Sequence, residues 1–317
     1  MSSQVGSIQA LLEYLQLTPE QVGYSEQAAR AFPLRLPASL LARIQKGDPQ
    51  DPILRQVLPT TSELHQVPGF GTDPVGESGY SPAPGLLHKY PGRALLITTG
   101  ACAINCRYCF RRHFPYEEQE PSLQQALAWL EQREDIHEVI LSGGDPLTLS
   151  LRRLTQLWQQ LAQIPHLTRL RIHSRQPIVS PDCLTPDLLA LLAQPRFDTV
   201  LVVHSNHAAE LTDEVAQALA PLRAAGITLL NQSVLLKGIN DEVDTLKALS
   251  ERLFAVGVLP YYLHQLDRVQ GAAHFAVTDE KALELHHALR DSLSGYLVPK
   301  LVVELPGRSA KVALVDK

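Results

Sequence analysis

Between residues 94 and 294 the chain alternates short apolar segments, rich in β-branched residues, with longer amphipathic segments. Short apolar runs are typical of buried parallel strands, and apolar positions that recur every three to four residues predict helices. The predicted strands are residues 94–99, 138–142, 169–174, 199–204, 227–232 and 259–263. The predicted helices are residues 123–133, 151–163, 186–192, 211–225, 243–256 and 278–294. This alternation of strands and helices predicts an α/β fold with a parallel sheet, either open or curled into a barrel.

Two segments of different character precede the alternation. Residues 1–60 have helical periodicity, clearest in residues 8–15, and a second short helix is predicted at 40–44. Residues 61–93 contain so many Pro and Gly residues that we expect a loop without regular elements. The sequence therefore predicts a helical extension (1–60), a Pro/Gly-rich loop (61–93), a barrel (94–300) and a C-terminal segment (301–317).

Composition narrows the class of protein. A chain of 317 residues with 45% hydrophobic and 19% charged residues is typical of a compact globular protein. Its net charge of −5 provides no positive field for nucleic acid. Residues 1–7 do not resemble a signal peptide, and no run of about 18 apolar residues predicts a membrane span. We therefore expect a cytoplasmic protein without a nucleic-acid or membrane partner.

Most of the predicted strands end in polar residues, although buried parallel strands are usually apolar throughout. The strand ends carry Ser142, Ser174, His204, Gln232 and, just after the last predicted strand, His264. In parallel α/β sheets the active site lies at the carboxyl ends of the strands. We expect the functional site at this edge.

Three of the four cysteines, Cys102, Cys106 and Cys109, follow the first predicted strand within eight positions. A structural zinc site needs four ligands, and only His113 offers a nearby fourth, since Cys183 stands alone. Three thiolates instead suit a [4Fe-4S] cluster whose fourth iron stays open to a small molecule. We expect this cluster on the triplet and a free thiol at Cys183.

The segment from Cys102 to Cys109, with Tyr108 before the third cysteine, resembles the signature of radical S-adenosylmethionine (SAM) enzymes. The segment Ser142-Gly143-Gly144-Asp145 resembles the glycine-rich motif of the same superfamily. The resemblance implies a partial (β/α)6 barrel, open and similar to a TIM barrel. It also implies that SAM binds the open iron, with Tyr108 near the adenine and the backbone of the glycine motif near the amino group.

From about residue 85 to the end, the chain resembles the lysine 2,3-aminomutase family. The resemblance is carried by residues 88–93, 109–114, 232–241, 260–275 and 306–311. It implies an isomerase that moves the α-amino group of L-lysine to Cβ and uses a [4Fe-4S] cluster, SAM and pyridoxal 5′-phosphate (PLP). Three departures from the family pattern are Lys89 for an arginine, Glu304 for an aspartate, and the lack of further cysteines for a zinc site.

The resemblance also implies roles for individual residues. The expected set is Lys311 as the lysine that binds PLP covalently; Lys89, Tyr90 and Arg93 at the PLP phosphate; Arg111 on the substrate carboxylate; Asp267 and Glu304 on the distal ammonium of lysine; and His204 and Gln232 near SAM. Two acidic residues favour a cationic substrate by Coulomb attraction. The resemblance therefore implies lysine as the substrate.

The short form of the chain resembles the branch of the family that supplies (R)-β-lysine to a lysyl-tRNA-synthetase-like ligase, which modifies elongation factor P. An electron donor such as flavodoxin or ferredoxin is a further expected partner. Two alternatives stay open. One is an aminomutase of free amino-acid metabolism, serving lysine catabolism or osmolyte synthesis. The other is a non-catalytic protein that binds an iron–sulfur cluster or zinc.

Overall fold

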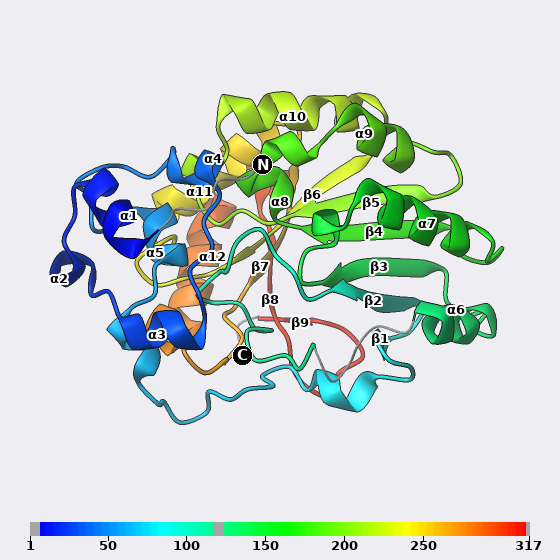
Figure 1. Cartoon of the computed structure of the whole chain (residues 1–317), viewed down its shortest axis with the longest axis horizontal. Helices are drawn as coiled ribbons and strands as arrows, with labels where there is room; N and C mark the ends of the chain where they lie inside the picture. The colour runs from blue at the N-terminus through cyan, green and yellow to red at the C-terminus, as the bar shows by residue number, and fades with distance from the viewer. Residues whose placement is uncertain (1–6, 117–122, 315–317) are drawn as a thin grey trace.

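The computed structural model describes residues 7–116 and 123–314, and a nine-stranded sheet forms its body (Figure 1). The strands are β1 Leu86–Tyr90, β2 Arg93–Thr99, β3 Glu138–Gly143, β4 Arg169–Ser174, β5 Asp198–Val203, β6 Thr228–Val234, β7 Leu259–His264, β8 Lys300–Val303 and β9 Val312–Ala313. They lie in chain order; β2 to β8 are parallel, while β1 and β9 pair antiparallel with β2 and β8. Because β1 and β9 are the two edges, the sheet is open, which confirms the predicted α/β fold with an open, TIM-like barrel.

Helices cover the outer side of the curved sheet (Figure 1). They are α6 Leu123–Glu131, α7 Leu151–Ala162, α8 Gln176–Val179, α9 Pro186–Leu192, α10 Asp213–Ala224, α11 Val243–Ala255 and α12 Asp279–Ser292. The spacing of Leu154, Leu157, Trp158 and Leu161 places one apolar stripe of α7 in the main core, against strand residues such as Leu141. The helices predicted between the strands are confirmed, with ends that differ by at most two residues.

The N-terminal residues form five short helices beside the barrel (Figure 1). They are α1 Ile8–Leu15, α2 Pro19–Val22, α3 Glu26–Ala31, α4 Ala38–Leu41 and α5 Pro52–Val57. Ser7 caps α1 and Thr18 forms a capping box on α2, so side chains satisfy the first backbone N–H groups. The apolar core of this extension includes Ile104 of the cysteine loop and Val179 of α8. The extension therefore packs directly on the segment that carries the cysteines.

Several short elements were not predicted. The structure has 3-10 helices at η1 Thr61–Leu64, η2 Glu77–Tyr80, η3 Pro146–Thr148, η4 Pro181–Cys183, η5 Ala208–Glu210, η6 Ala273–Phe275 and η7 Gly295–Leu297. The expectation that residues 61–93 lack regular elements is wrong at β1, which pairs with β2 across the turn at Gly92. The last strands, β8 and β9, also went unpredicted, so the parallel part has one strand more than expected.

No helix among the described residues is long and apolar enough to cross a membrane. Residues 1–6, on which most of the expectation of no signal peptide rested, lie outside the described ranges.

Candidate active site

A cavity of about 680 Å³ lies on the inner side of the sheet and brings together every residue to which the sequence analysis assigned a role. Its wall includes Lys89, Tyr90, Arg93, Cys102, Cys106, Tyr108, Cys109, Arg111, Ser142, Gly143, Gly144, Asp145, His204, Gln232, Asp267, Glu304 and Lys311. A second hollow, of about 730 Å³, lies near α6 and α7 and contains none of them. This second hollow is therefore separate from the candidate site.

The cysteine loop that follows β2 is fixed from outside the cavity by the N-terminal extension and by η1, which directly follows the extension. The Arg107 guanidinium forms a fully buried ion pair with Glu63, at 2.6 Å between Nη2 and Oε2. The backbone N–H of Arg107 donates to the carbonyl of Gln56 at 2.9 Å, and the Asn105 amide donates to the carbonyl of Pro33 at 2.9 Å. These contacts hold the loop so that its three cysteines line one cavity.

The three cysteines line the same cavity and provide three thiolate ligands, which fit a [4Fe-4S] cluster. Burial raises the pKa of the Cys109 thiol to about 11, and burial likewise raises the pKa of Cys102. Thiols with such pKa values become thiolates at neutral pH only when a metal replaces the proton. Within the described ranges, no three Cys, His, Asp or Glu side chains are arranged around a single metal ion. The fourth cysteine, Cys183, lies in η4 and is not part of the cavity wall.

The glycine turn after β3 packs against the start of the cysteine loop. A Cβ atom on Gly144 would lie 2.4 Å from the carbonyl oxygen of Ala101, and Gly143 has φ of +110°. The N–H groups of Gly144 and Asp145 donate to the carbonyls of Thr99 and Ala101 at 2.7 and 2.8 Å. Only glycine fits this close approach, and the cysteine loop and the glycine turn are therefore fixed to each other.

The carboxylate of Asp145 is used inside the protein. It accepts hydrogen bonds from the hydroxyl of Ser174 at 2.7 Å and from the N–H groups of Leu147, Arg175 and Gln176 at 2.8 to 3.0 Å. The bonds from Ser174, Arg175 and Gln176 connect the end of β3 to the end of β4, and the bond from Leu147 caps η3. The side chain of Asp145 thus positions the strand ends, although it also lines the cavity.

Tyr108 and His204 lie together, as their expected places near SAM require. Their rings stack with centroids 5.8 Å apart, and the Tyr108 hydroxyl is 3.2 Å from Nε2 of His204. Burial, with the nearby Arg175 cation, lowers the pKa of His204 to about 3, so this imidazole is neutral at physiological pH. Gln232 of β6 lines the same cavity.

Arg111 is buried and is bound by a carboxylate of the protein itself. Its Nε and Nη2 donate to the two oxygens of Glu77 at 2.8 and 2.5 Å. Its Nη1 donates to the Ser142 hydroxyl at 3.1 Å and to the Gly143 carbonyl at 3.3 Å. A guanidinium has five N–H groups, so one remains on Nη2. A substrate carboxylate can therefore accept two hydrogen bonds from the Arg111 guanidinium only if it displaces the Glu77 carboxylate.

Glu304 lies among the residues expected at PLP. Its carboxylate accepts from Nζ of Lys89 at 2.5 Å, from Nζ of Lys311 at 2.9 Å and from the Tyr90 hydroxyl. Burial alone would raise the pKa of Glu304, but Lys311 and these hydrogen bonds outweigh it and lower the pKa. The Arg93 guanidinium lies 4.6 Å from the centroid of the Tyr90 ring. The structure thus brings Glu304 to the two lysines, where its single negative charge offsets one of their two positive charges.

Asp267, just after β7, differs from Glu304 because its carboxylate has no hydrogen bond or ion pair with any described residue. Burial raises its pKa to about 7; Lys311 lowers the pKa and Glu304 raises it. Asp267 is half-buried in the cavity wall, and its raised pKa shows that its charged form lacks compensation there, which a cationic ligand would supply. Asp267 is therefore available to a ligand in the cavity.

Several cavity residues were missed or left without a role by the sequence analysis. They are Glu77, His173, Arg175 and His264. Burial, with the nearby Lys311, lowers the pKa of both histidines, so both are neutral at physiological pH. His264 had been singled out as a polar residue at a strand end, and the same signal was present at His173 within β4. Glu77 carried no such signal, because it lies in the Pro/Gly-rich segment.

Comparison with known families defines the class of protein first. A family model of the radical SAM superfamily matches residues 96–249, from β2 into α11. Together with the cysteine triplet and the glycine turn, this match identifies a radical SAM protein, whose cofactors are a [4Fe-4S] cluster and SAM. Among solved structures, a radical SAM methyltransferase from Sphaerobacter thermophilus superposes with a TM-score of 0.46 and 15% identity, over 69% of this chain and 68% of that chain.

Closer relatives then define the family. A protein of Escherichia coli (strain K12) is 50% identical over 93% of this chain and 87% of its own length, and one of Haemophilus influenzae is 47% identical over 96% and 91%. Both are named L-lysine 2,3-aminomutase. The chain belongs to the L-lysine 2,3-aminomutase family of radical SAM isomerases.

Proposed function

We propose that the chain converts L-lysine into β-lysine, so that the α-amino group and one hydrogen on Cβ exchange places. The observation that carries the proposal is Asp267, a half-buried carboxylate in the cavity wall without a cationic partner among the described residues. The distal ammonium of lysine supplies that partner. Arg111 lines the same cavity and offers a guanidinium for the α-carboxylate. The two ends of a lysine molecule thus find opposite charges in one cavity.

The proposal includes PLP as a second cofactor. When bound, SAM on the reduced cluster supplies a radical that abstracts hydrogen, and PLP holds the migrating nitrogen. The residues that fit PLP are Lys311, whose amine lies in the cavity, and Lys89, Tyr90 and Arg93, which bring positive charge and a hydroxyl to a phosphate. Glu304 accepts a hydrogen bond from Lys89 at one oxygen and from Lys311 at the other.

The activity itself is tested with anaerobic protein, dithionite, SAM, PLP and L-lysine, followed by mass spectrometry and chromatography for β-lysine. Chiral separation of the product tests the (R) configuration that we propose. The proposal would be contradicted if lysine were converted only into products other than β-lysine. It would also be contradicted if protein with a full cluster converted no lysine.

Asp267→Asn is expected to lower kcat/KM for lysine by about thirty-fold to several thousand-fold, about 2–5 kcal/mol, because a buried cation loses its charge partner. In the unaltered chain, kcat/KM should rise as the pH increases through about 7, since the Asp267 carboxyl becomes charged there. This rise should be absent in Asp267→Asn. The measurement is steady-state kinetics between pH 6 and 8.5.

The control for Asp267→Asn is SAM cleavage by the reduced protein without lysine, which should stay close to the unaltered rate. That reaction depends on the cysteine loop and the glycine turn, which Asp267 does not contact through any described hydrogen bond. Unchanged lysine kinetics in Asp267→Asn would show that this carboxylate does not bind the substrate.

We further propose that the product is (R)-β-lysine for a lysyl-tRNA-synthetase-like ligase that modifies elongation factor P in the cytoplasm. The support is the resemblance of residues 306–311 to that branch of the family. The test combines the chain, the ligase and elongation factor P with L-lysine, an electron donor such as flavodoxin, SAM and PLP. We expect the factor to gain the mass of one β-lysyl group, and a factor that stays unmodified while free β-lysine accumulates would favour free amino-acid metabolism.

A further inference from the structure

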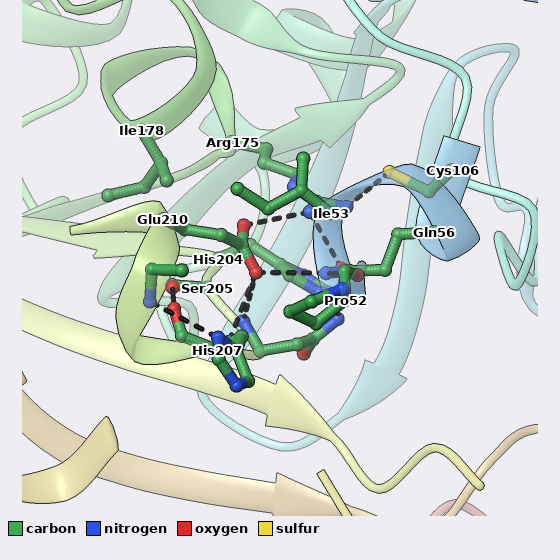
Figure 2. A network of polar contacts seen from close by, with 12 residues as sticks. Pro52, Ile53, Gln56, Cys106, Arg175, Ile178, His204, Ser205, His207 and Glu210 are labelled. Atoms are coloured by element: carbon green, nitrogen blue, oxygen red, sulfur yellow. Dashed lines mark hydrogen bonds and ion pairs between the residues drawn. The ribbon is translucent and has the colours of Figure 1, made fainter. Parts of the chain in front are cut away.

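A buried arginine connects the N-terminal extension to one of the cluster cysteines. Arg175 directly follows β4, and its guanidinium lies close to α5 and to the cysteine loop (Figure 2). Its Nη1 donates to Sγ of Cys106 at 2.8 Å and to the hydroxyl of Tyr108. Its Nη2 donates to Oε1 of Gln56 and to Oε2 of Glu210, both at 2.8 Å. Nothing in the proposed reaction has so far used this guanidinium.

The amide of Gln56 can take only one orientation in this network. Its Nε2 donates to the carbonyl of Pro52 at 2.9 Å and to Oε1 of Glu210 at 3.1 Å. Its Oε1 accepts from Nδ2 of Asn206 at 3.0 Å as well as from Arg175. A reversed amide would bring donors against donors and oxygen against oxygen. Gln56 therefore holds Arg175 through its oxygen, as the dashed contacts in Figure 2 show.

The helix that carries Gln56 is itself firmly placed. The Asp51 carboxylate caps α5 and accepts from the N–H groups of Ile53 and Leu54 at 2.9 and 2.8 Å. Ile53, Leu54 and Val57 are buried in the core of the extension. A side chain on such a helix is a fixed support, so the extension supplies one of the contacts that hold the Arg175 guanidinium, beside the ion pair with Glu210.

A cation that donates to a cluster thiolate acts more strongly on the reduced cluster. Reduction adds one negative charge, which spreads over the irons and their sulfur ligands. A charge-assisted N–H···S bond in a buried, weakly polar site stabilises that added charge and so raises the reduction potential. Cys106 receives such a bond from Arg175, whose side chain is almost completely buried.

We propose that Arg175 is a positioning residue that raises the reduction potential of the cluster through Cys106, and that Gln56 of the N-terminal extension holds Arg175 in place. This inference rests on the assignment of Cys106 as a cluster ligand. It gives the extension a part in the electron transfer that must precede SAM cleavage.

The test measures the midpoint potential of the cluster in the full chain, reconstituted anaerobically and titrated with dithionite and mediators in the absence of SAM, PLP and lysine. Electron paramagnetic resonance reports the reduced fraction. Arg175→Met should make reduction about tenfold less favourable, equivalent to about 59 mV for one electron. Gln56→Met should shift the equilibrium in the same direction by about threefold, and Arg175→Lys should lie between Arg175→Met and the unaltered chain.

Arg43→Met is the matched control. Arg43 is a buried cation of the same region, but its Nη1 donates to the carbonyls of Ile178 and Glu210 and not to a cysteine. Its removal should leave the midpoint unchanged at equal iron content. If Arg175→Met fails to assemble the cluster, Gln56→Met and Arg175→Lys decide the question.

Midpoints in Arg175→Met and Gln56→Met equal to that of the unaltered chain, at full iron content, would overturn the inference. An equal shift in Arg43→Met would also overturn it, because the effect would then be a general loss of buried charge. These outcomes are independent of lysine turnover, so they separate this inference from the proposed aminomutase activity. Retention of a full cluster by Cys106→Ala would instead show that the ligand assignment beneath it is wrong.

Discussion

Replacing Cys102, Cys106 or Cys109 by alanine is expected to remove the [4Fe-4S] cluster completely. All three thiols line one end of the same cavity on a loop held by the extension, and each must bind one iron because the fourth iron is left open for SAM. Two thiolates would leave two irons without a protein ligand. Iron and sulfide analysis after anaerobic reconstitution, with absorbance near 400 nm, measures the loss.

Cys183→Ala is the matched control for these variants. Cys183 is also a free cysteine, but it lies in η4, away from the cavity wall. We expect this variant to bind as much iron as the unaltered chain. A full cluster in Cys106→Ala, or a cluster lost in Cys183→Ala with an intact fold, would contradict the assignment.

Lys311→Ala is expected to abolish lysine turnover and the covalent attachment of PLP. The Lys311 amine lies in the cavity 2.9 Å from Glu304, which can accept or return a proton when the amine changes its charge. Among the described residues of the cavity wall, the lysine that then remains is Lys89, which contacts the other oxygen of Glu304. Borohydride reduction followed by peptide mapping measures which lysine carries the pyridoxyl group.

Lys89→Met separates the two lysines. We expect this variant to carry the pyridoxyl group on Lys311 but to need a higher PLP concentration for half-saturation, since a phosphate contact is lost. A pyridoxyl group found on Lys89 of the unaltered chain would show that Lys89, and not Lys311, binds PLP covalently. Lys311→Ala with undiminished β-lysine formation would exclude Lys311 as an obligatory anchor.

The repeated part of the fold could be predicted because its signal is local. Residues 169–174 form β4 with the predicted ends, and α9 also has its predicted ends, since apolar periodicity and Pro186 mark them. The strands β1, β8 and β9 lack that signal. They are short, they stand at or near the sheet edges, and β1 follows a segment full of Pro and Gly. They become strands because they pair with a neighbouring strand of the sheet. A short stretch of sequence does not contain that neighbour, so it cannot predict the pairing.

The candidate site divides in the same way. Residues with a motif, such as Cys106 and Gly144, were predicted, and the structure brings them into one cavity. The residues that fix these motif residues in place were not predicted, because buried ion pairs and hydrogen bonds join distant parts of the chain. Glu77 finds Arg111 and Gln56 finds Arg175 only after folding. Their identity depends on tertiary distance and on burial, for which the sequence offered no spacing rule.

The open edge of the barrel has a mechanical consequence. In a closed barrel the circumference is fixed by the number of strands and their stagger, through backbone hydrogen bonds. Here the two edges, β1 and β8–β9, are joined by side chains, since Lys89 of β1 and Lys311 before β9 both bind Glu304. At this seam four side chains, those of Lys89, Tyr90, Glu304 and Lys311, stand where a closed barrel has strand pairing, so a change in their contacts would widen or tighten the barrel without the loss of a strand pairing.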